Sequence, residues 1–100
     1  MLDLWDTKVT DAGLKELKEL VSLQTLDLRT TRVTDAGLKD LKELKSLRKL
    51  SLLGTEVTNV GIKQLKDLKN LEELNVIATK VTAAGAKELE EARPGLKVIH

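Results

Sequence analysis

The sequence predicts a single α/β solenoid domain over residues 1–100, built from four stacked coils. The first observation is an internal repeat, because segments 2–25, 26–49, 50–73 and 74–97 align with one another without a gap. The second is a change of hydrophobic period within each segment, from alternation to a spacing of three residues. A unit this short cannot bury its own apolar face, so neighbouring units must stack and share a continuous core.

Each segment begins with a short strand. Leu26 and Leu28 alternate with Asp27 and Arg29, which is the pattern of a strand with one buried face. Equivalent strands begin at Leu2, Leu50 and Leu74.

A helix of about ten residues is expected after each strand. Apolar residues recur there at Leu38, Leu41, Leu44 and Leu47. Thr34 is placed to be the N-cap, and Asp35 adds negative charge at the helix N-terminus, in the favourable i,i+4 order with Lys39. The same threonine stands at Thr10, Thr58 and Thr82.

Glycine occupies one early helix position in every copy, as Gly13, Gly37, Gly61 and Gly85. Glycine costs about 1 kcal/mol relative to alanine inside a helix. Its presence in all four copies predicts a close approach of the backbone to a neighbouring coil.

The stretch Leu23-x-x-Leu26-x-Leu28-x-x-Thr31-x-Val33 resembles the leucine-rich repeat consensus LxxLxLxxNxL. The TDAGL that follows resembles the helix start of bacterial GALA and cysteine-containing repeats, which are relatives of the ribonuclease-inhibitor class. The resemblance covers nearly the whole chain. It implies a right-handed solenoid with a parallel sheet on the concave face and helices on the convex face. It also implies protein recognition on the concave face, with no catalytic residue.

One departure from the family pattern is systematic. Threonine stands where the family usually has asparagine or cysteine, at Thr7, Thr31, Thr55 and Thr79. A hydroxyl offers fewer hydrogen-bonding groups than an asparagine amide, and we expect it to bond the backbone of an adjacent coil.

The fourth segment departs from the repeat. Ala86 and Ala92 replace leucines, and Arg93-Pro94-Gly95 marks a turn before a last alternating strand over 96–100. Terminal repeats of solenoids are usually atypical, so this strand is expected to cap the C-terminal end. The N-terminal segment shows no such change, which fits a piece of a longer array, a minimal array or a designed one.

Composition and charge narrow the function. The chain has 17 basic and 16 acidic residues and a net charge of +1, which gives no sign of nucleic acid or an anionic membrane as a partner. Cysteine is absent, which removes disulfides and thiolate chemistry. The N-terminal residues include acids and no long apolar run, so we expect no signal peptide, no membrane span and a cytoplasmic location by default.

The four copies act as a small internal alignment. The inward column is valine throughout, at Val9, Val33, Val57 and Val81. The largest chemical changes fall in three outward columns, which are Asp3, Asp27, Ser51 and Asn75, then Trp5, Arg29, Leu53 and Ile77, then Asp6, Thr30, Gly54 and Ala78.

These outward columns are expected to line the concave face and to bind protein. The predicted surface comprises Asp3, Trp5, Asp6, Asp27, Arg29, Thr30, Ser51, Leu53, Asn75 and Ile77. Tryptophan and arginine are enriched in interaction hot spots, which favours a non-enzymatic protein-interaction module. The alternatives are relaxed selection on a solvated sheet, or a structural or designed scaffold with no ligand of its own.

The concave acids raise the question of a catalytic or metal site. Asp3 and Asp27 lie one repeat apart, on strands about 4.8 Å from each other, and like charges this close raise one pKa. Their column continues as Ser51 and Asn75, whereas calcium takes six to eight oxygen ligands. His100 is the only histidine. We therefore expect no catalytic, metal or cofactor site.

The lack of a polar cap on the first coil predicts that the chain self-associates. This coil has no polar cap above its apolar residues Leu2, Leu4, Val9, Leu14, Leu17 and Leu20. The strand over 2–6 is also an unpaired edge. We expect a homodimer through the N-terminal ends, most simply with two-fold symmetry.

Overall fold

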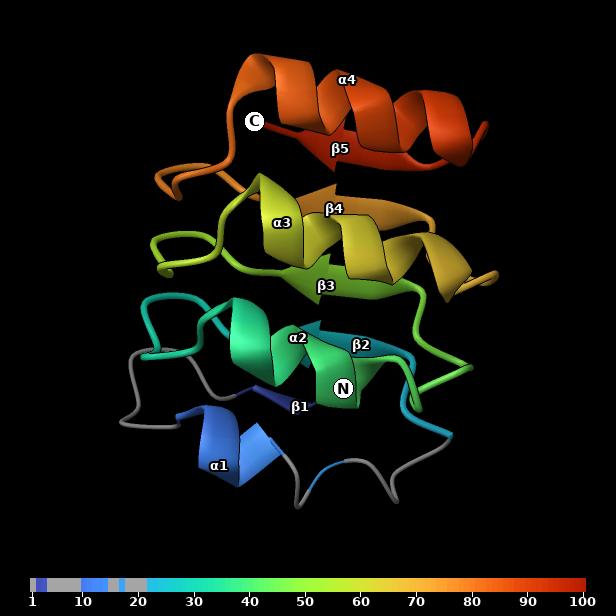
Figure 1. Ribbon diagram of the computed structural model, residues 1–100. Helices are drawn as coiled ribbons and strands as arrows, with labels where there is room; N and C mark the ends of the chain where they lie inside the picture. The colour runs from blue at the N-terminus through green and yellow to red at the C-terminus, as the bar shows by residue number, and fades with distance from the viewer. Residues whose placement is uncertain (1, 4–9, 15–16, 18–21) are drawn as a thin grey trace.

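The computed structural model describes residues 2–3, 10–14, 17 and 22–100. Strands and helices alternate as β1 (Leu2–Asp3), α1 (Asp11–Leu14), β2 (Thr25–Asp27), α2 (Asp35–Leu41), β3 (Lys49–Ser51), α3 (Asn59–Ile62), the 3-10 helix η2 (Lys63–Asp67), β4 (Glu73–Asn75), α4 (Ala83–Ala92) and β5 (Lys97–Ile99). Figure 1 shows these elements stacked as successive coils, with β5 lying beside α4 at the C-terminal end.

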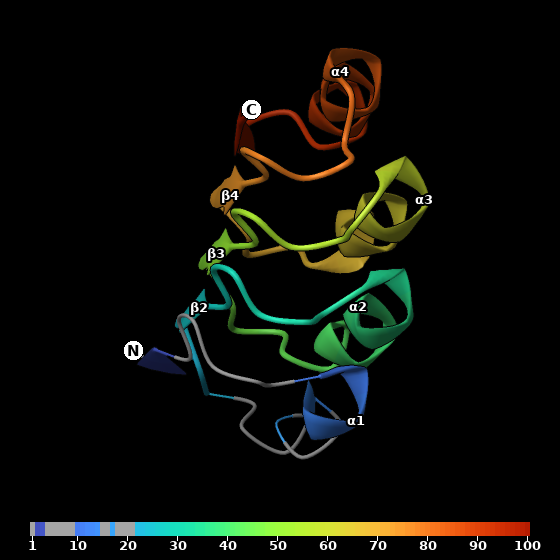
Figure 2. The ribbon, with the colours of Figure 1, turned by 90° about the vertical axis from the view of Figure 1, so that its left-hand side faces the viewer.

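The strands of the described residues form one parallel sheet in the chain order β1 to β5. Leu26 pairs with Leu50, and Leu50 pairs with Leu74, so the register equals the 24-residue interval of the sequence repeat. Figure 2 shows the strands more closely spaced than the helices on the other side. The sheet therefore lies on the inner, concave side of the curve, and the predicted α/β solenoid is confirmed.

Every strand from β2 to β5 contributes a buried central residue to a shared core. Leu26, Leu50, Leu74 and Val98 are at most 6 % exposed, and they pack with the buried leucines of the return segments in one cluster. The residues on either side of each central residue face the open side of the sheet, because side chains alternate along a strand.

Helices α2 and α3 are shorter than the expected ten residues, whereas α4 has ten. Helix α2 has seven residues, and α3 has four before the chain continues as η2. The amide of Leu44 donates to the carbonyl of Leu41, and that of Leu68 to that of Leu65, each bond reaching three residues back. A 3-10 helix has three residues per turn, so leucines spaced by three all face the core when the helix tightens.

The threonine column bonds its own coil and not the adjacent one, so that expectation was wrong. Thr31 Oγ1 donates to the Leu28 carbonyl at 2.9 Å, and Thr55 Oγ1 donates to the Leu52 carbonyl at 2.7 Å. The chain turns directly after each strand, and the hydroxyl closes this turn three residues back. Thr7 lies outside the described residues.

Thr55→Val is expected to lower the free energy of unfolding by about 1 kcal/mol, which is the value of one lost hydrogen bond. The cost stays moderate because the Leu52 carbonyl also accepts from the Thr55 amide at 3.0 Å. Denaturant melts measure the change. Thr25→Val, which alters a strand residue on the open face, is the matched control and should be nearly neutral. Equal midpoints for Thr55→Val and wild type would contradict the bond.

Successive coils are joined by the side chain that opens each helix. Asp35 Oδ1 accepts from the Thr58 amide at 2.7 Å, and Asp35 Oδ2 accepts from Thr58 Oγ1 at 2.5 Å. Asp11 bonds Thr34 in the same way, and Asn59 bonds the Thr82 amide and hydroxyl through its own amide group. We call these three pairs, Asp11–Thr34, Asp35–Thr58 and Asn59–Thr82, the inter-coil clasps.

The clasps explain the glycine column. A Cβ added to Gly61 would lie 2.1 Å from Asp35 Oδ1, and one added to Gly85 would lie 2.0 Å from Asn59 Oδ1. The predicted close approach to a neighbouring coil is confirmed, and the group approached is the clasp side chain.

The clasps also alter the expected N-caps. Thr58 accepts from the Val60 amide and Thr82 accepts from the Gly85 amide, as expected. Thr34 occupies the predicted N-cap position of α2, but its side chain accepts no hydrogen bond from a helix amide. Its hydroxyl donates to Asp11 of the preceding coil instead.

Candidate functional site

The open face of the sheet carries side chains in rows that cross the strands. The leading row, at the strand starts, is Thr25, Lys49, Glu73 and Lys97. The middle row is Asp27, Ser51, Asn75 and Ile99. The exit row, just past the strand ends, is Arg29, Leu53 and Ile77. Parallel strands lie about 4.8 Å apart, so members of one row are neighbours although they are far apart in sequence.

Two members of the middle row hold the chain where it leaves the sheet. Asp27 Oδ1 accepts from the Arg29 amide at 3.1 Å, and Asn75 Oδ1 accepts from the Ile77 amide at 3.0 Å. These predicted binding residues therefore also have a structural role. The Arg29 guanidinium returns to Asp27, with Nη2 placed 2.8 Å from Oδ2.

The Asp27 carboxylate is the titratable group that this arrangement perturbs. Partial burial raises the pKa of Asp27, but the hydrogen bonds from the Arg29 side chain and backbone and the guanidinium charge lower it more. The pKa of Asp27 therefore lies below its ordinary value, and the carboxylate stays ionised at neutral pH. This pairing neutralises the acid of the middle row from within the chain.

The small side chain of Ser51 leaves a depression at the centre of the open sheet face. A hollow of about 210 Å³ lies there, lined by residues that include Thr25, Lys49, Ser51, Glu73, Asn75 and Ile99. The Ser51 hydroxyl oxygen is buried and has no hydrogen-bond partner among the described residues. The small side chain between larger neighbours leaves room for a group from outside.

The exit row is apolar over two neighbouring coils. Ile77 is 41 % exposed, and Leu53 beside it is partly exposed. The next residue of each coil takes a positive φ, at Thr30 (54°), Gly54 (74°) and Ala78 (59°). A positive φ favours glycine, so Thr30 and Ala78 have a strained backbone conformation at this turn.

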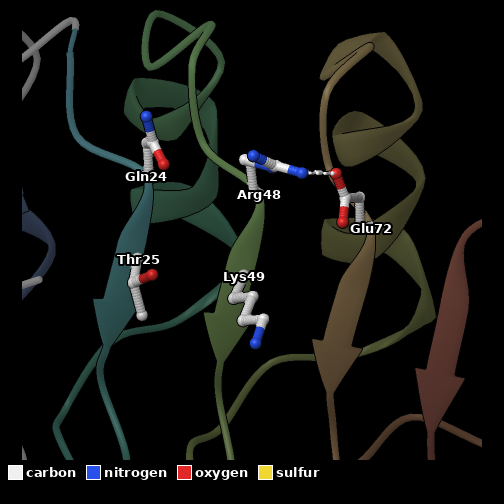
Figure 3. A pocket seen from close by; sticks show the side chains of 5 residues that line it. All are labelled: Gln24, Thr25, Arg48, Lys49 and Glu72. Atoms are coloured by element: carbon white, nitrogen blue, oxygen red, sulfur yellow. Dashed lines mark hydrogen bonds and ion pairs between the residues drawn. The ribbon is translucent and has the colours of Figure 1, made fainter.

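A second hollow, of about 390 Å³, lies where the strands begin. It is lined by Gln24, Thr25, Arg48, Lys49 and Glu72, whose side chains Figure 3 shows along the starts of β2 to β4. The Arg48 guanidinium forms an ion pair with Glu72 on the next coil at 2.6 Å, with both side chains more than half exposed.

The binding surface predicted from the sequence does not include the residues of this second hollow or of the leading row. The signal is present, because both columns change from neutral to basic to acidic between consecutive copies. They lie one and two residues before the buried leucine of each strand, outside the three outward columns of the predicted surface.

Some predicted residues cannot be placed. Trp5 and Asp6 lie outside the described residues, so the hot spot at Trp5 stays a prediction. Asp3 belongs to β1, where its backbone pairs with Asp27. Within the described part of the chain, no three His, Cys, Asp or Glu side chains gather as a metal site.

The predicted apolar patch of the first coil is only partly described. Leu14 is fully buried, so its side chain adds nothing to an exposed apolar surface at this end. Leu17 is partly buried against the core. Leu4, Val9 and Leu20 lie outside the described residues, and the homodimer stays a prediction. None of the described helices has the length and apolar character needed to cross a membrane.

Comparisons with known proteins agree with the coil geometry. The sequence profile of the leucine-rich repeat family matches residues 20–42, a span that includes β2 and α2. A chain in the structure of the Mex67:Mtr2 subunits of Chaetomium is similar with a TM-score of 0.70 and 22 % identity, over 94 % of this chain and 71 % of that chain. A leucine-rich repeat protein of Leptospira interrogans is similar with a TM-score of 0.60 and 19 % identity, over 86 % of this chain and 27 % of that chain.

At these identities, the solved structures show a shared fold alone. No curated protein matches the chain. The match to the family profile over residues 20–42 identifies a leucine-rich repeat there, and the repeat interval and the parallel sheet backed by helices show that the chain has the α/β solenoid fold of leucine-rich repeat proteins.

Proposed function

We propose that this chain is a non-enzymatic protein-interaction module that binds its partner on the concave sheet face. The observation that carries the proposal is a contrast between columns. The buried strand residue is leucine at Leu26, Leu50 and Leu74, and the threonine is unchanged in all three clasps. The rows on the open face change between basic, acidic, polar and apolar from one coil to the next.

The exposed apolar surface supports the same assignment. Ile77 and Leu53 stand side by side on a sheet face with charged residues along its leading row. Protein interfaces combine apolar contact area with polar groups around it, and the exit row and the leading row supply these two parts on opposite sides of this face. The similar Chaetomium chain comes from a structure of two subunits, which fits a fold used in protein assembly.

Ile77→Asp is expected to weaken partner binding at least tenfold, because it buries a charge in the apolar part of the interface. Val60→Asp is the matched control, because Val60 is a comparable exposed aliphatic residue, 67 % exposed, on helix α3 away from the sheet. Both variants should keep the wild-type thermal midpoint, since neither residue belongs to the core.

The measurement is a three-way capture from an extract of the cells that express the chain, followed by titration of the purified partner. We expect a protein retained by wild type and Val60→Asp and lost by Ile77→Asp. Equal retention by both variants would contradict binding on the concave face. Absence of any protein enriched over a blank surface would favour the scaffold alternative.

A further inference from the structure

The concave face also indicates what shape of partner it accepts. Resting on the proposed function, we propose that the occupant is an amphipathic α-helix of a partner protein, lying across strands β3 to β5. One flank of this helix carries acidic, basic and acidic side chains over Lys49, Glu73 and Lys97. The other flank carries apolar side chains over Leu53 and Ile77.

The width of the face fits a helix. The leading and exit rows are four residues apart in sequence, with Lys49 at the start of β3 and Leu53 two residues past its end. At about 3.3 Å per residue of extended chain, the two rows are separated by at most roughly 13 Å. A helix with its side chains is about 10–12 Å across, so it lies between the two rows and touches both.

The middle row between them leaves space for this helix. Ser51 is its smallest member, and the hollow of about 210 Å³ lies over it. The side chains of Asp27 and Asn75 on either side accept hydrogen bonds from the amides of Arg29 and Ile77, which holds them close to the backbone. The floor of the face is therefore low where a helix would lie.

The strand spacing also matches a helix. Parallel strands repeat about every 4.8 Å. Residues three or four apart on a helix are about 4.5–6 Å apart along its axis, so one side chain meets each strand. Same-side residues of an extended segment are about 6.6 Å apart, and such a segment loses register after two strands.

The charges of the leading row are available to a partner. Arg48 is paired with Glu72, and Arg29 with Asp27. Lys49, Glu73 and Lys97 form no ion pair with the described residues, although they stand on neighbouring strands. A helix with acid, base and acid in this order gives each of them an opposite charge.

The test uses peptide libraries displayed on phage and selected on the immobilised full chain. One library holds helical peptides of about 18 residues, or five turns, with one face randomised. The other holds unstructured peptides of similar length. We expect helices to be enriched, with acid, base and acid at consecutive i,i+3 or i,i+4 positions beside an apolar flank.

The decisive variant reverses two charges, as Lys49→Glu with Glu73→Lys. It should weaken the helices selected on wild type on the order of tenfold, and it should itself select the reversed charge order. Lys63→Glu with Glu88→Lys is the matched control, because it reverses an exposed pair 4.0 Å apart on the helical side, and it should change nothing.

Two outcomes of the selection overturn the proposal. The first is that no helical peptide is enriched, whether extended peptides are enriched or none are. The second is that the selected helices have the same charge order on wild type and on Lys49→Glu with Glu73→Lys. Binders that ignore the reversal but are lost on Ile77→Asp would remove the helix and leave the concave module standing. Binders that survive Ile77→Asp as well would remove both.

Discussion

Gly61→Ala is expected to destabilise the chain by about 2–3 kcal/mol, and Asp35→Ala is expected to remove most of that penalty. The added Cβ would lie 2.1 Å from Asp35 Oδ1 and 2.7 Å from Asp35 Cγ, closer than real atoms approach. Asp35 cannot turn aside freely, because its two oxygens hold the amide and hydroxyl of Thr58. Accommodating the methyl group therefore breaks the inter-coil clasp.

The two substitutions form a double-mutant cycle. Asp35→Ala alone leaves the Thr58 amide without its partner and should cost about 1–3 kcal/mol. In that background, the contacts with Oδ1 and Cγ are gone, and the Cβ at position 35, 3.0 Å from the added Cβ, is the tight contact that remains. Alanine is favoured over glycine in a helix by about 1 kcal/mol, which offsets this contact. Equilibrium denaturation of the four proteins measures the coupling.

The next clasp is a control within the same molecule. Gly85→Ala paired with Asn59→Ala should show coupling of the same sign, because Asn59 Oδ1 would lie 2.0 Å from the new Cβ. If Gly61→Ala cost the same with and without Asp35, the clasp would not be the reason for glycine.

Leu52→Ala is expected to cost about 2–5 kcal/mol, whereas Leu53→Ala should cost less than about 1 kcal/mol. The two leucines are adjacent in sequence, but Leu52 is 0 % exposed inside the core and Leu53 lies on the open face. The truncated side chain at position 52 leaves a cavity between the sheet and the return segments.

Thermal and denaturant melts of the two variants test the alternation directly. Their chemistry is identical, so the difference reports only which face each side chain occupies. Similar losses for both would mean that Leu53 packs in the core and does not belong to the exposed apolar surface of the exit row.

The stacking of the coils is predictable from the sequence because it follows from the 24-residue interval of the repeat. Leucines 24 residues apart, such as Leu26 and Leu50, occupy the same place in every coil, so the repeat dictates the pairing of the strands. The lengths of α2 and α3 do not follow from the interval alone. Apolar residues spaced by three from Ile62 to Leu71 are compatible with both a longer α-helix and a 3-10 continuation, and the structure has the second.

The inter-coil clasps could not be predicted from the sequence, for a different reason. Asp35 and Thr58 lie 23 residues apart, and each has an ordinary local role at a helix start that hides the contact between them. A clearer signal is the column Asp11, Asp35, Asn59 and Ala83, in which the fourth copy alone lacks a hydrogen-bonding side chain.

The candidate site is predictable in part. The middle and exit rows follow from strand alternation, but the leading row was missed although Lys49 and Glu73 differ in charge between copies. The internal ion pair of Arg29 with Asp27 depends on side-chain conformation, which alternation does not determine.

The most direct test of binding on the concave face is a chemical-shift map of the isotope-labelled chain, titrated with the partner retained in the capture experiment. We predict that the largest changes in backbone chemical shift fall at Lys49, Ser51, Leu53, Asn75 and Ile77. The chemical shifts of the exposed residues of α3 and α4 should not change. Largest shifts at Val60 and Lys63 on the helical side, with the three rows unchanged, would contradict it.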